Sequence, residues 1–442
     1  MAADRYDVVV VGARCAGAPL AALLARVGAR VAVVERASFP SDTLSSHLFE
    51  ADALAFLDRL GLIDALRATA APLVGWTDTR VEDLRLSMAL PQRPADVGGM
   101  ASVRRSLLDP LLAGAAQESG AELYTATEVT ALLEERGRVA GVCVKDADGE
   151  RELRARLVVG ADGRHSTVAK LCRARRYNVT PNQRLLYWAF FEAADAGTRP
   201  TFLTHRWDER FILGIPADSG LYQVLLWPEM AELEAFRADP AAAFIAHART
   251  CEPIAQALAD ARQVGKVLGA VRWEGFFREA SGPGWVLSGD AGHFKSPSPG
   301  RGIGDAFLQA DSLAATILGA LDRSDGELDA QLVRWGRRRD REFAEHYWLA
   351  YDFEEPGTVP AVLVEILRGL EKQGNAGLFF EVLNHRLRPS QLLTPPRVAA
   401  ATARLLASGR VERGAFLRKL GALGGQDMRR RLHNRRPVYA AA

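Results

Sequence analysis

The sequence predicts a mixed α/β fold in which an α/β nucleotide-binding domain carries an inserted β-sheet domain and a helical C-terminal region. Three stretches of the 442-residue chain lead to this prediction. Residues 7–35 read as strand, tight turn, helix and strand, residues 177–277 hold short aromatic-rich strands, and residues 326–442 read as largely helical. Because 48% of the residues are hydrophobic, the chain can bury a large core and form two or three subdomains.

The first stretch has the layout of a dinucleotide-binding fingerprint. An apolar run, Val8–Val11, ends at Gly12; five residues later Gly17 opens an Ala/Leu-rich segment, and a second apolar run ends at Glu35. In such a unit the first glycine makes the turn, the helix N-terminus faces a pyrophosphate, and the acid accepts hydrogen bonds from a ribose hydroxyl. The middle glycine of G-x-G-x-x-G is Arg14, whose side chain has to point away from the phosphates. Taken alone, the stretch is also compatible with an ordinary βαβ unit.

Composition narrows the functional class. The net charge is +2 with mixed signs, which argues against a general nucleic-acid binder. The four cysteines, Cys15, Cys143, Cys172 and Cys251, are far apart and form no metal-ligand cluster or C-x-x-C motif. The first strand starts too early for a signal peptide, and no apolar run reaches transmembrane length. We therefore expect a reduced cytoplasmic protein with no bound metal and no stable membrane insertion.

A hydroxyl-rich loop at residues 37–47 follows the fingerprint. We expect it to enter a helix at about 48–60, with Ser45 and Ser46 as candidate caps. His47 is either a packed or capping histidine or a neighbour of a cofactor ring. Residues 72–100, rich in Pro and Gly with short strand-like pieces, read as an excursion from the first domain.

A second strand–turn–helix junction occurs at residues 157–170, after a predicted helix and β-meander. An apolar strand meets Asp162-Gly163 and a helix start, which together can present backbone amides and one acid to a polar ligand. An Asp-Gly turn that simply caps a helix is the alternative.

A third junction occurs at residues 284–306. A strand delivers Asp290 to its tip, and a Pro/Gly-rich loop leads into another helix, ending near residue 321. Gly300 and Gly302 allow the backbone to approach a flat ligand closely.

Between the last two junctions, residues 177–277 alternate aromatic and polar positions, with an Ala-rich helical insertion at about 229–262. These aromatic residues are more often core than ligand wall, although such a sheet also makes a natural substrate roof. In the helical tail, basic runs at 334–339 and 429–431 favour a solvated helix face over a binding patch.

Together the three junctions resemble FAD-dependent oxidoreductases of the p-hydroxybenzoate hydroxylase fold, which include aromatic monooxygenases, geranylgeranyl reductases and flavin halogenases. The motifs occur in family order and span about three quarters of the chain. The matches are the fingerprint at 12–17 with Glu35, R-x-x-L-D-x-x-L at 105–112, G-A-D-G-x-x-S-x-V at 160–168, G-D-A-x-H-x-x-x-P at 289–297 and G-x-G at 300–302.

The resemblance implies a division into four parts. Residues 1–176, with the excursion at 72–100, and 278–325 would form the two parts of a Rossmann-like FAD-binding domain of the glutathione reductase type. Residues 177–277 would form the β-rich substrate domain, and 326–442 the helical C-terminal region.

The resemblance also implies roles toward FAD. Glu35 would hold the adenosine ribose, Arg105 and the first turn would face the pyrophosphate, Asp290 would bind the ribityl chain, and the amides of 300–303 would face the pyrimidine edge, where amide dipoles stabilise reduced flavin. The residues expected to bind FAD are Gly12, Ala13, Cys15, Ala16, Gly17, Glu35, Arg36, Arg105, Val129, Asp162, Gly163, Gly289, Asp290, Pro297, Gly300, Gly302 and Ile303.

Some positions depart from the family pattern. The usual asparagine after G-x-G is Gly304, the later aspartate is Gln309, and the residue between the two glycines is Arg301, interpreted as an anion contact or a surface residue. Halogenases carry W-x-W-x-I-P, whereas residues 211–216 lack both tryptophans.

The leading functional hypothesis is an NAD(P)H-dependent monooxygenase that hydroxylates an apolar or aromatic small molecule with O₂ through a flavin hydroperoxide. His47, His293 and Lys295 are the candidates for proton handling or substrate orientation. A reductase of prenyl-type or other activated double bonds is the alternative, and a non-catalytic flavin-binding protein comes third. We expect a monomer or a homodimer.

Overall fold

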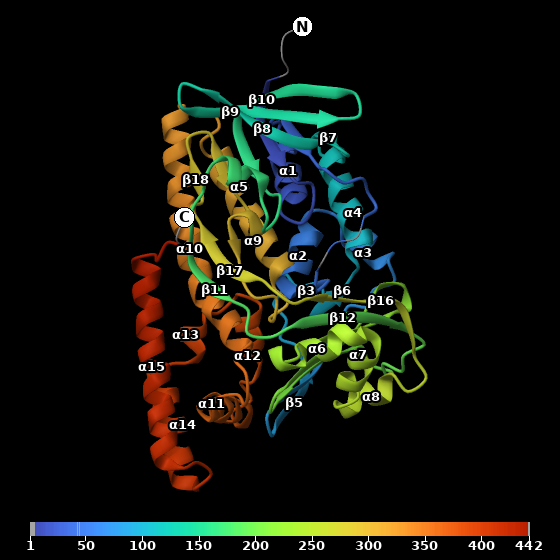
Figure 1. Cartoon of the computed structure of the whole chain (residues 1–442), viewed down its shortest axis with the longest axis vertical. Coiled ribbons are helices and arrows are strands. Elements are labelled where there is room, and N and C mark those ends of the chain that lie inside the picture. The colour runs from blue at the N-terminus through green and yellow to red at the C-terminus, as the bar shows by residue number, and fades with distance from the viewer. Residues whose placement is uncertain (1–4, 42, 44, 441–442) are drawn as a thin grey trace.

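The computed structural model describes residues 5–41, 43 and 45–440. In Figure 1 the strands that begin the chain lie at the top, a second sheet lies at the lower right, and the C-terminal helices run down the left edge. This arrangement is the mixed α/β fold with a helical C-terminal region that the sequence predicts.

The first sheet has eight strands, and its centre is parallel. Strand β1 (Arg5–Val11) pairs with β2 (Val31–Val34) on one side and with β10 (Gly149–Gly160) on the other. Next to these lie β7 (Glu122–Tyr124) and β19 (Trp285–Leu287), both also parallel to their neighbours. Because parallel strands end at the same edge, the turns after β1, β10 and β19 meet there, and this edge is where α/β sheets bind ligands.

Helices cover one face of this sheet, and a β-meander covers part of the other. The nearly continuous Val runs of β1, β2 and β10 are buried on both faces, as expected for parallel strands. On one face pack α1 (Gly17–Ala25), α2 (Ala51–Arg59), α4 (Arg105–Glu118) and α9 (Gly302–Leu318). The other face carries β8 (Glu128–Glu135), β9 (Arg138–Asp146) and α5 (Thr167–Leu171), and β18 (Ser281–Gly282) pairs with β19 at the edge.

The second sheet has seven strands drawn from two separate parts of the chain. Strands β4 (Trp76–Val81) and β5 (Leu84–Ala89) come from the excursion at 72–100, and β4 pairs in parallel with β13. The other strands are β12 (Leu186–Glu192), β13 (Thr201–Trp207), β14 (Arg210–Pro216), β15 (Tyr222–Leu226) and β16 (Arg262–Ala270). The Ala-rich insertion forms α6 (Leu233–Ala238), α7 (Pro240–Ala248) and α8 (Glu252–Ala257), which pack on one face of this sheet.

Two small sheets connect these units. Strands β3 (Leu48–Glu50) and β6 (Met100–Ser102) form one. The other contains β11 (Arg176–Pro181), β17 (Glu274–Arg278) and β20 (His293–Phe294). Outside these sheets, a short helix α3 (Ile63–Arg67) follows α2.

The helix expected at 48–60 starts later than predicted. Its first three residues form β3 instead, because they pair with β6, and the N-cap of α2 is Glu50. The prediction that Ser45 and Ser46 cap this helix is therefore wrong. Ser45 Oγ accepts a hydrogen bond from the His47 N–H at 3.1 Å, and Ser46 Oγ lies 3.5 Å from the Gly300 carbonyl oxygen.

The C-terminal region is helical, as predicted. The 29-residue α10 (Asp325–Phe353) begins at a capping box between Ser324 and Glu327 and packs against α9. It is followed by α11 (Ala361–Lys372), α12 (Gly377–Leu383), α13 (Pro389–Leu392), α14 (Pro395–Ser408) and α15 (Arg413–Arg435). Within the described ranges, no helix has both the length and the apolar character needed to cross a bilayer.

Candidate functional site

Two glycines shape the turn after β1. Gly12 has φ +103°, and a Cβ there would lie 2.4 Å from the Ala161 carbonyl oxygen, at the end of β10. A Cβ on Gly17 would lie 1.8 Å from the Gly12 carbonyl oxygen. Any larger residue at either position would push the turn away from the sheet or from α1, so this turn needs both glycines.

Glu35 closes this turn from the end of β2. Its carboxylate is buried and accepts the N–H groups of Ala13 and Ala37, each at 3.0 Å. Thr127 donates its N–H to the Glu35 carbonyl oxygen, which brings the start of β8, and with it the buried Val129, next to the same corner. Arg36, the next residue in the chain, is exposed.

Arg14 reaches α4 through an ion pair. Its guanidinium lies 2.7 Å from Asp109, and the same fully buried carboxylate lies 2.7 Å from Arg105 Nε. Arg14 also donates to Ser41 Oγ at 2.9 Å. The side chain that replaces the middle glycine is therefore held by partners of its own. Beside it, burial raises the pKa of the Cys15 thiol to about 12, so the thiol stays protonated.

The second junction supports the helix that follows it. Asp162 Oδ2 accepts the N–H groups of Thr167 and Val168 at 2.7 and 3.1 Å, while Oδ1 is buried and has no hydrogen-bond partner among the described residues. Gly163 has φ +79° and lies in the turn itself. Asp162 thus accepts the first two N–H groups of α5, whose N-cap is Ser166, so the Asp-Gly turn supports the helix start while one carboxyl oxygen stays without a partner among the described residues.

The third junction touches the first. Gly289 has φ +60°, and a Cβ on it would lie 2.6 Å from the Ala16 Cβ. Its N–H donates to Gln309 Oε1 of α9 at 3.1 Å. Asp290 follows in a short 3₁₀ turn, and burial together with Asp305 raises its pKa to about 6, while Arg105 opposes the rise. The fingerprint, the R-x-x-L-D helix and the G-D-A turn therefore meet within electrostatic range.

The N-terminus of α9 supplies unpaired backbone donors next to these turns. The first turn of any α-helix has N–H groups without intrahelical acceptors. Gly302 opens α9, and a Cβ there would meet no atom within 4 Å, whereas Ile303 is buried beneath it. Gly300 has φ +77° and packs on Leu48, and Pro297 accepts its N–H. An electron-rich group placed at Gly302 would face amides and the positive end of a 17-residue helix.

Arg301 is not a surface residue, so the interpretation of this arginine as a surface residue is wrong. Its side chain is fully buried and lies 3.0 Å from Glu50, 2.7 Å from Asp52 and 3.6 Å from Asp305. A Cβ on Gly304 would lie 2.9 Å from the Arg301 guanidinium carbon. Gly304 therefore makes room for Arg301, and the two departures from the family pattern form one structural feature.

Lys295 lies in a second part of this buried ionic cluster. Its Nζ lies 2.6 Å from Asp305 Oδ2 and 3.0 Å from His385 Nε2, and His385 Nδ1 lies 3.2 Å from Asp305 Oδ1. Burial lowers the pKa values of both Lys295 and His385, although Asp305 opposes the shift at Lys295. Sequence reasoning missed His385 because nothing near it in the helical tail indicates a partner 90 residues away.

A carboxyl group from the end of α10 also reaches the loop before α9. Glu354 is fully buried; its Oε1 lies 2.9 Å from Ser298 Oγ, and Ser296 also hydrogen-bonds to it. Its Oε2 accepts the Gln183 N–H at 3.1 Å, which ties the loop to the second sheet. Burial raises the pKa of Glu354 to about 7, and the serines partly oppose this. Glu354 was also missed, since no motif surrounds it.

The candidate catalytic histidines lie in different surroundings. His47 is buried, accepts the Arg105 N–H through Nδ1 at 3.2 Å and packs against Phe190 at 5.4 Å between ring centroids. Burial and then Arg105 lower its pKa to about 3, so the ring is neutral. His293 is enclosed by aromatic rings, with Phe277 at 4.5 Å and Phe343 at 5.3 Å. His47 therefore lies beside the converging turns, whereas His293 packs among aromatic side chains.

An apolar, aromatic face of the second sheet looks toward β3 and the loop before α9. Trp188, Phe190 and Phe211 of this face form one cluster with Leu48 of β3 and with Phe294. The face opposite to α6–α8 is therefore the one nearest the converging turns.

These features fit an extended dinucleotide such as FAD. The first turn has the close approaches that a pyrophosphate cradle needs, since Gly12 and Gly17 leave no room for a Cβ. Glu35 bonds to this turn through Ala13, and Gly289, next to Asp290, lies against Ala16 and bonds to Gln309 of α9. Acceptors for sugar hydroxyls and donors for phosphate and ring oxygens thus lie close together.

Comparison with known proteins agrees with this geometry. A family described as "FAD binding domain" matches residues 5–330. The chain is similar to 6-methylpretetramide 4-monooxygenase of Streptomyces rimosus, at 29% identity over 76% of this chain and 81% of the relative. It is also similar to digeranylgeranylglycerophospholipid reductase of Methanocella arvoryzae, at 28% identity over 75% of this chain and 81% of that one.

A solved structure shares the fold. The myxobacterial chondrochloren halogenase CndH, described as a new variant of FAD-dependent halogenases, superposes with a TM-score of 0.70 at 21% identity, over 86% of this chain and 92% of that chain. The match to the family covers well over half of the chain and includes all three junctions. The protein therefore belongs to the FAD-binding-domain family and is an FAD-dependent oxidoreductase.

Proposed function

We propose that this protein is an NAD(P)H-dependent monooxygenase that hydroxylates an apolar or aromatic small molecule with O₂. The observation that carries the proposal is the meeting of the three turns and the α9 N-terminus beneath an aromatic sheet face. Similarity to a 4-monooxygenase over most of both chains supports oxygen insertion as the reaction.

In this proposal the first and third junctions, together with Arg105 of α4, hold the parts of the cofactor. The turn at 12–17 and Arg105 face the pyrophosphate, Glu35 accepts the ribose hydroxyls, and Asp290 binds the ribityl chain. Bound FAD would supply the redox chemistry of the site, as an acceptor of hydride from NAD(P)H and, once reduced, as the group that reacts with O₂. The amides at the start of α9 stabilise negative charge on the pyrimidine edge of the ring.

The aromatic face of the second sheet forms the substrate side of the site. Phe190 and Trp188 give this side an apolar surface that excludes water, as oxygen transfer requires. His47, a neutral ring with Nδ1 already accepting a hydrogen bond, presents only Nε2–H as a donor and so orients a polar group rather than removing a proton. Lys295 is committed to Asp305, so its contribution is to position the loop before α9.

A reductase of prenyl-type or other activated double bonds is the second candidate, favoured by the similarity to digeranylgeranylglycerophospholipid reductase. The halogenase motif is absent from residues 211–216, which lie in β14. A non-catalytic flavin-binding protein loses its main support, because Gly304 and Gln309 of α9 have packing and hydrogen-bonding roles, toward Arg301 and Gly289 respectively.

The test is NAD(P)H oxidation by the FAD-loaded protein, with and without O₂, across phenolic, heteroaromatic and isoprenoid compounds. We expect substrate-stimulated, O₂-dependent oxidation and a product heavier by one oxygen atom. Anaerobic oxidation with a product that gains two hydrogens would instead establish the reductase. Asp290→Ala should abolish FAD retention, whereas Asp311→Ala, on the exposed side of α9 in a pair with Arg59, should retain it.

A further inference from the structure

The last long helix, α15, lies at the outer edge of the fold and packs on it along one side only. Figure 1 shows α15 along the outer edge of the molecule, and no residue of this helix is buried. Among the described residues, nine large hydrophobic side chains are exposed, and more than half of them belong to the segment from Leu417 to Tyr439. Leu417, Met428 and Leu432 are 50%, 74% and 54% exposed. Exposed apolar side chains concentrated in this way mark an interaction surface.

The same helix concentrates positive charge. Residues 413–435 contain seven Lys or Arg residues and one Asp, giving the helix a net charge of +6. The whole chain has a net charge of only +2, so the remainder of the protein is acidic overall. Two of the seven cations are held in ion pairs, Arg430 with Asp352 and Arg431 with Asp427.

The charged and apolar groups are ordered around the helix axis. At 3.6 residues per turn, Leu417, Met428 and Leu432 fall within about 60° of one another. On the same count, Arg413 and Arg431 lie roughly 40° to one side of this apolar stripe, and Arg418 and Arg429 lie about 40–60° to the other. The stripe is therefore bordered by cations on both sides.

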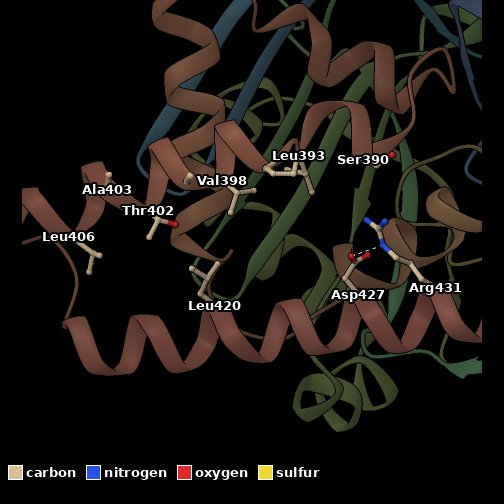
Figure 2. Close-up of a pocket in the computed structure, with 11 residues that line it drawn as sticks. Ser390, Leu393, Val398, Thr402, Ala403, Leu406, Leu420, Asp427 and Arg431 are labelled. Carbon is tan, nitrogen blue, oxygen red and sulfur yellow. Dashed lines mark hydrogen bonds and ion pairs between the residues drawn. The ribbon is translucent and has the colours of Figure 1, made fainter.

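A groove runs along the inner flank of the same helix. It has a volume of about 870 Å³ between α14 and α15 and is lined by apolar side chains such as Val398 and Leu406. Figure 2 shows Leu420 of α15 pointing toward α14, and the ion pair of Asp427 with Arg431 at one end. The apolar surface on this side of the molecule thus extends beyond the stripe itself.

These observations select among three kinds of occupant. A second copy of α15 would bring two sets of bordering arginines together, and like charges oppose that contact. A nucleic acid would satisfy the cations but leave the apolar stripe in water. An anionic lipid surface accepts both, because apolar side chains enter the boundary between headgroups and acyl chains while Lys and Arg meet the phosphates.

We propose that α15 binds reversibly to the surface of an anionic lipid membrane through Leu417, Met428, Leu432 and the arginines that border them. The helix lies in the plane of the surface and does not cross the bilayer. This attachment is independent of the chemistry proposed for the flavin site.

The test is flotation of the FAD-loaded full chain with vesicles of phosphatidylcholine alone and of phosphatidylcholine with 30% phosphatidylglycerol. We expect binding to the anionic vesicles that exceeds binding to the neutral ones at least tenfold and falls in 0.5 M NaCl. Each cation near such a surface contributes about fivefold, so Arg413→Gln/Arg418→Gln/Arg429→Gln should lower binding on the order of 100-fold. Leu417→Ser/Met428→Ser/Leu432→Ser should lower it at least tenfold.

Two control variants carry comparable changes outside α15. Val27→Ser/Val333→Ser alters exposed apolar residues, and Arg136→Gln/Arg173→Gln/Arg337→Gln alters exposed cations, all outside α15. Both controls should bind vesicles like the unmodified protein. Absence of binding to anionic vesicles, or equal losses in control and α15 variants, overturns the proposal. A dimer in light scattering that the leucine and methionine changes dissociate, without vesicle binding, assigns the stripe to self-association instead.

Discussion

Arg301→Met tests the most consequential departure from the family pattern. Arg301 is the cation shared by Glu50, Asp52 and Asp305, all within 3.6 Å, and its side chain has no exposure. Methionine keeps much of the volume but leaves three carboxyl groups without their common partner. Removing one member of a buried ion pair costs about 3–5 kcal/mol, because the remaining charge stays buried. We expect a loss of unfolding free energy in this range, together with weaker FAD binding, since Arg301 directly precedes the α9 N-terminus.

The assay is urea unfolding of the FAD-free protein, followed by FAD titration. Arg59→Met is the matched control, because Arg59 of α2 pairs with Asp311 of α9 at 2.8 Å, and the two side chains are 62% and 44% exposed. Such surface pairs contribute about 0–1 kcal/mol. Adding Glu50→Gln and Asp52→Asn to Arg301→Met should recover part of the lost stability. If Arg301→Met costs no more than Arg59→Met, the buried network does not stabilise the loop and this reasoning is wrong.

Three further predictions concern the other junctions. Gly289→Ala should lower FAD affinity at least tenfold, because its Cβ would meet Ala16 at 2.6 Å, whereas Gly326→Ala, with no atom within 4 Å, should bind FAD normally; flavin fluorescence titration measures both. Glu35→Gln has one acceptor oxygen for two amides and a ribose, so FAD affinity should fall about tenfold in the same titration, or roughly 1.4 kcal/mol. Because burial raises the pKa of Glu354 to about 7, its protonated form stabilises the fold below the ordinary glutamate pKa, and this contribution is lost as the pH rises toward 7. Urea midpoints between pH 5 and 8 should fall less for Glu354→Gln than for the unmodified protein, and parallel curves would contradict this.

The fold was largely predictable because its main elements carry local patterns. The Val run before Gly12 was predicted to be a strand followed by a tight turn, and the structure confirms this with a buried parallel strand. The helix expected at 48–60 failed at its start because β3 depends on pairing with β6, about 50 residues away. No local propensity reveals such a partner, and the same holds for β4, which joins the second sheet across more than 100 residues.

The site was predictable only where glycines and acids follow strands. Those positions read directly as turns and ligand acceptors, whereas the cluster around Lys295 is built from segments far apart in the chain. Arg301 illustrates the difference: a charged residue between two glycines suggested an exposed or anion-binding side chain, yet three carboxylates bury it. Burial of a charge depends on its partners, and those partners are set by the tertiary fold.

The loop between Asp290 and α9 explains why the helical tail belongs to the same functional unit as the flavin site. Ser296 and Ser298 of this loop hydrogen-bond to Glu354 at the end of α10. Lys295 of the same loop contacts His385, which lies just after α12. Both partners are buried, so removing the tail would leave a lysine and two hydroxyl groups without them. In the proposed function, this loop would set the position of the α9 N-terminus, and the C-terminal region would act on the flavin ring through these contacts, even though none of the recognised motifs lies within it.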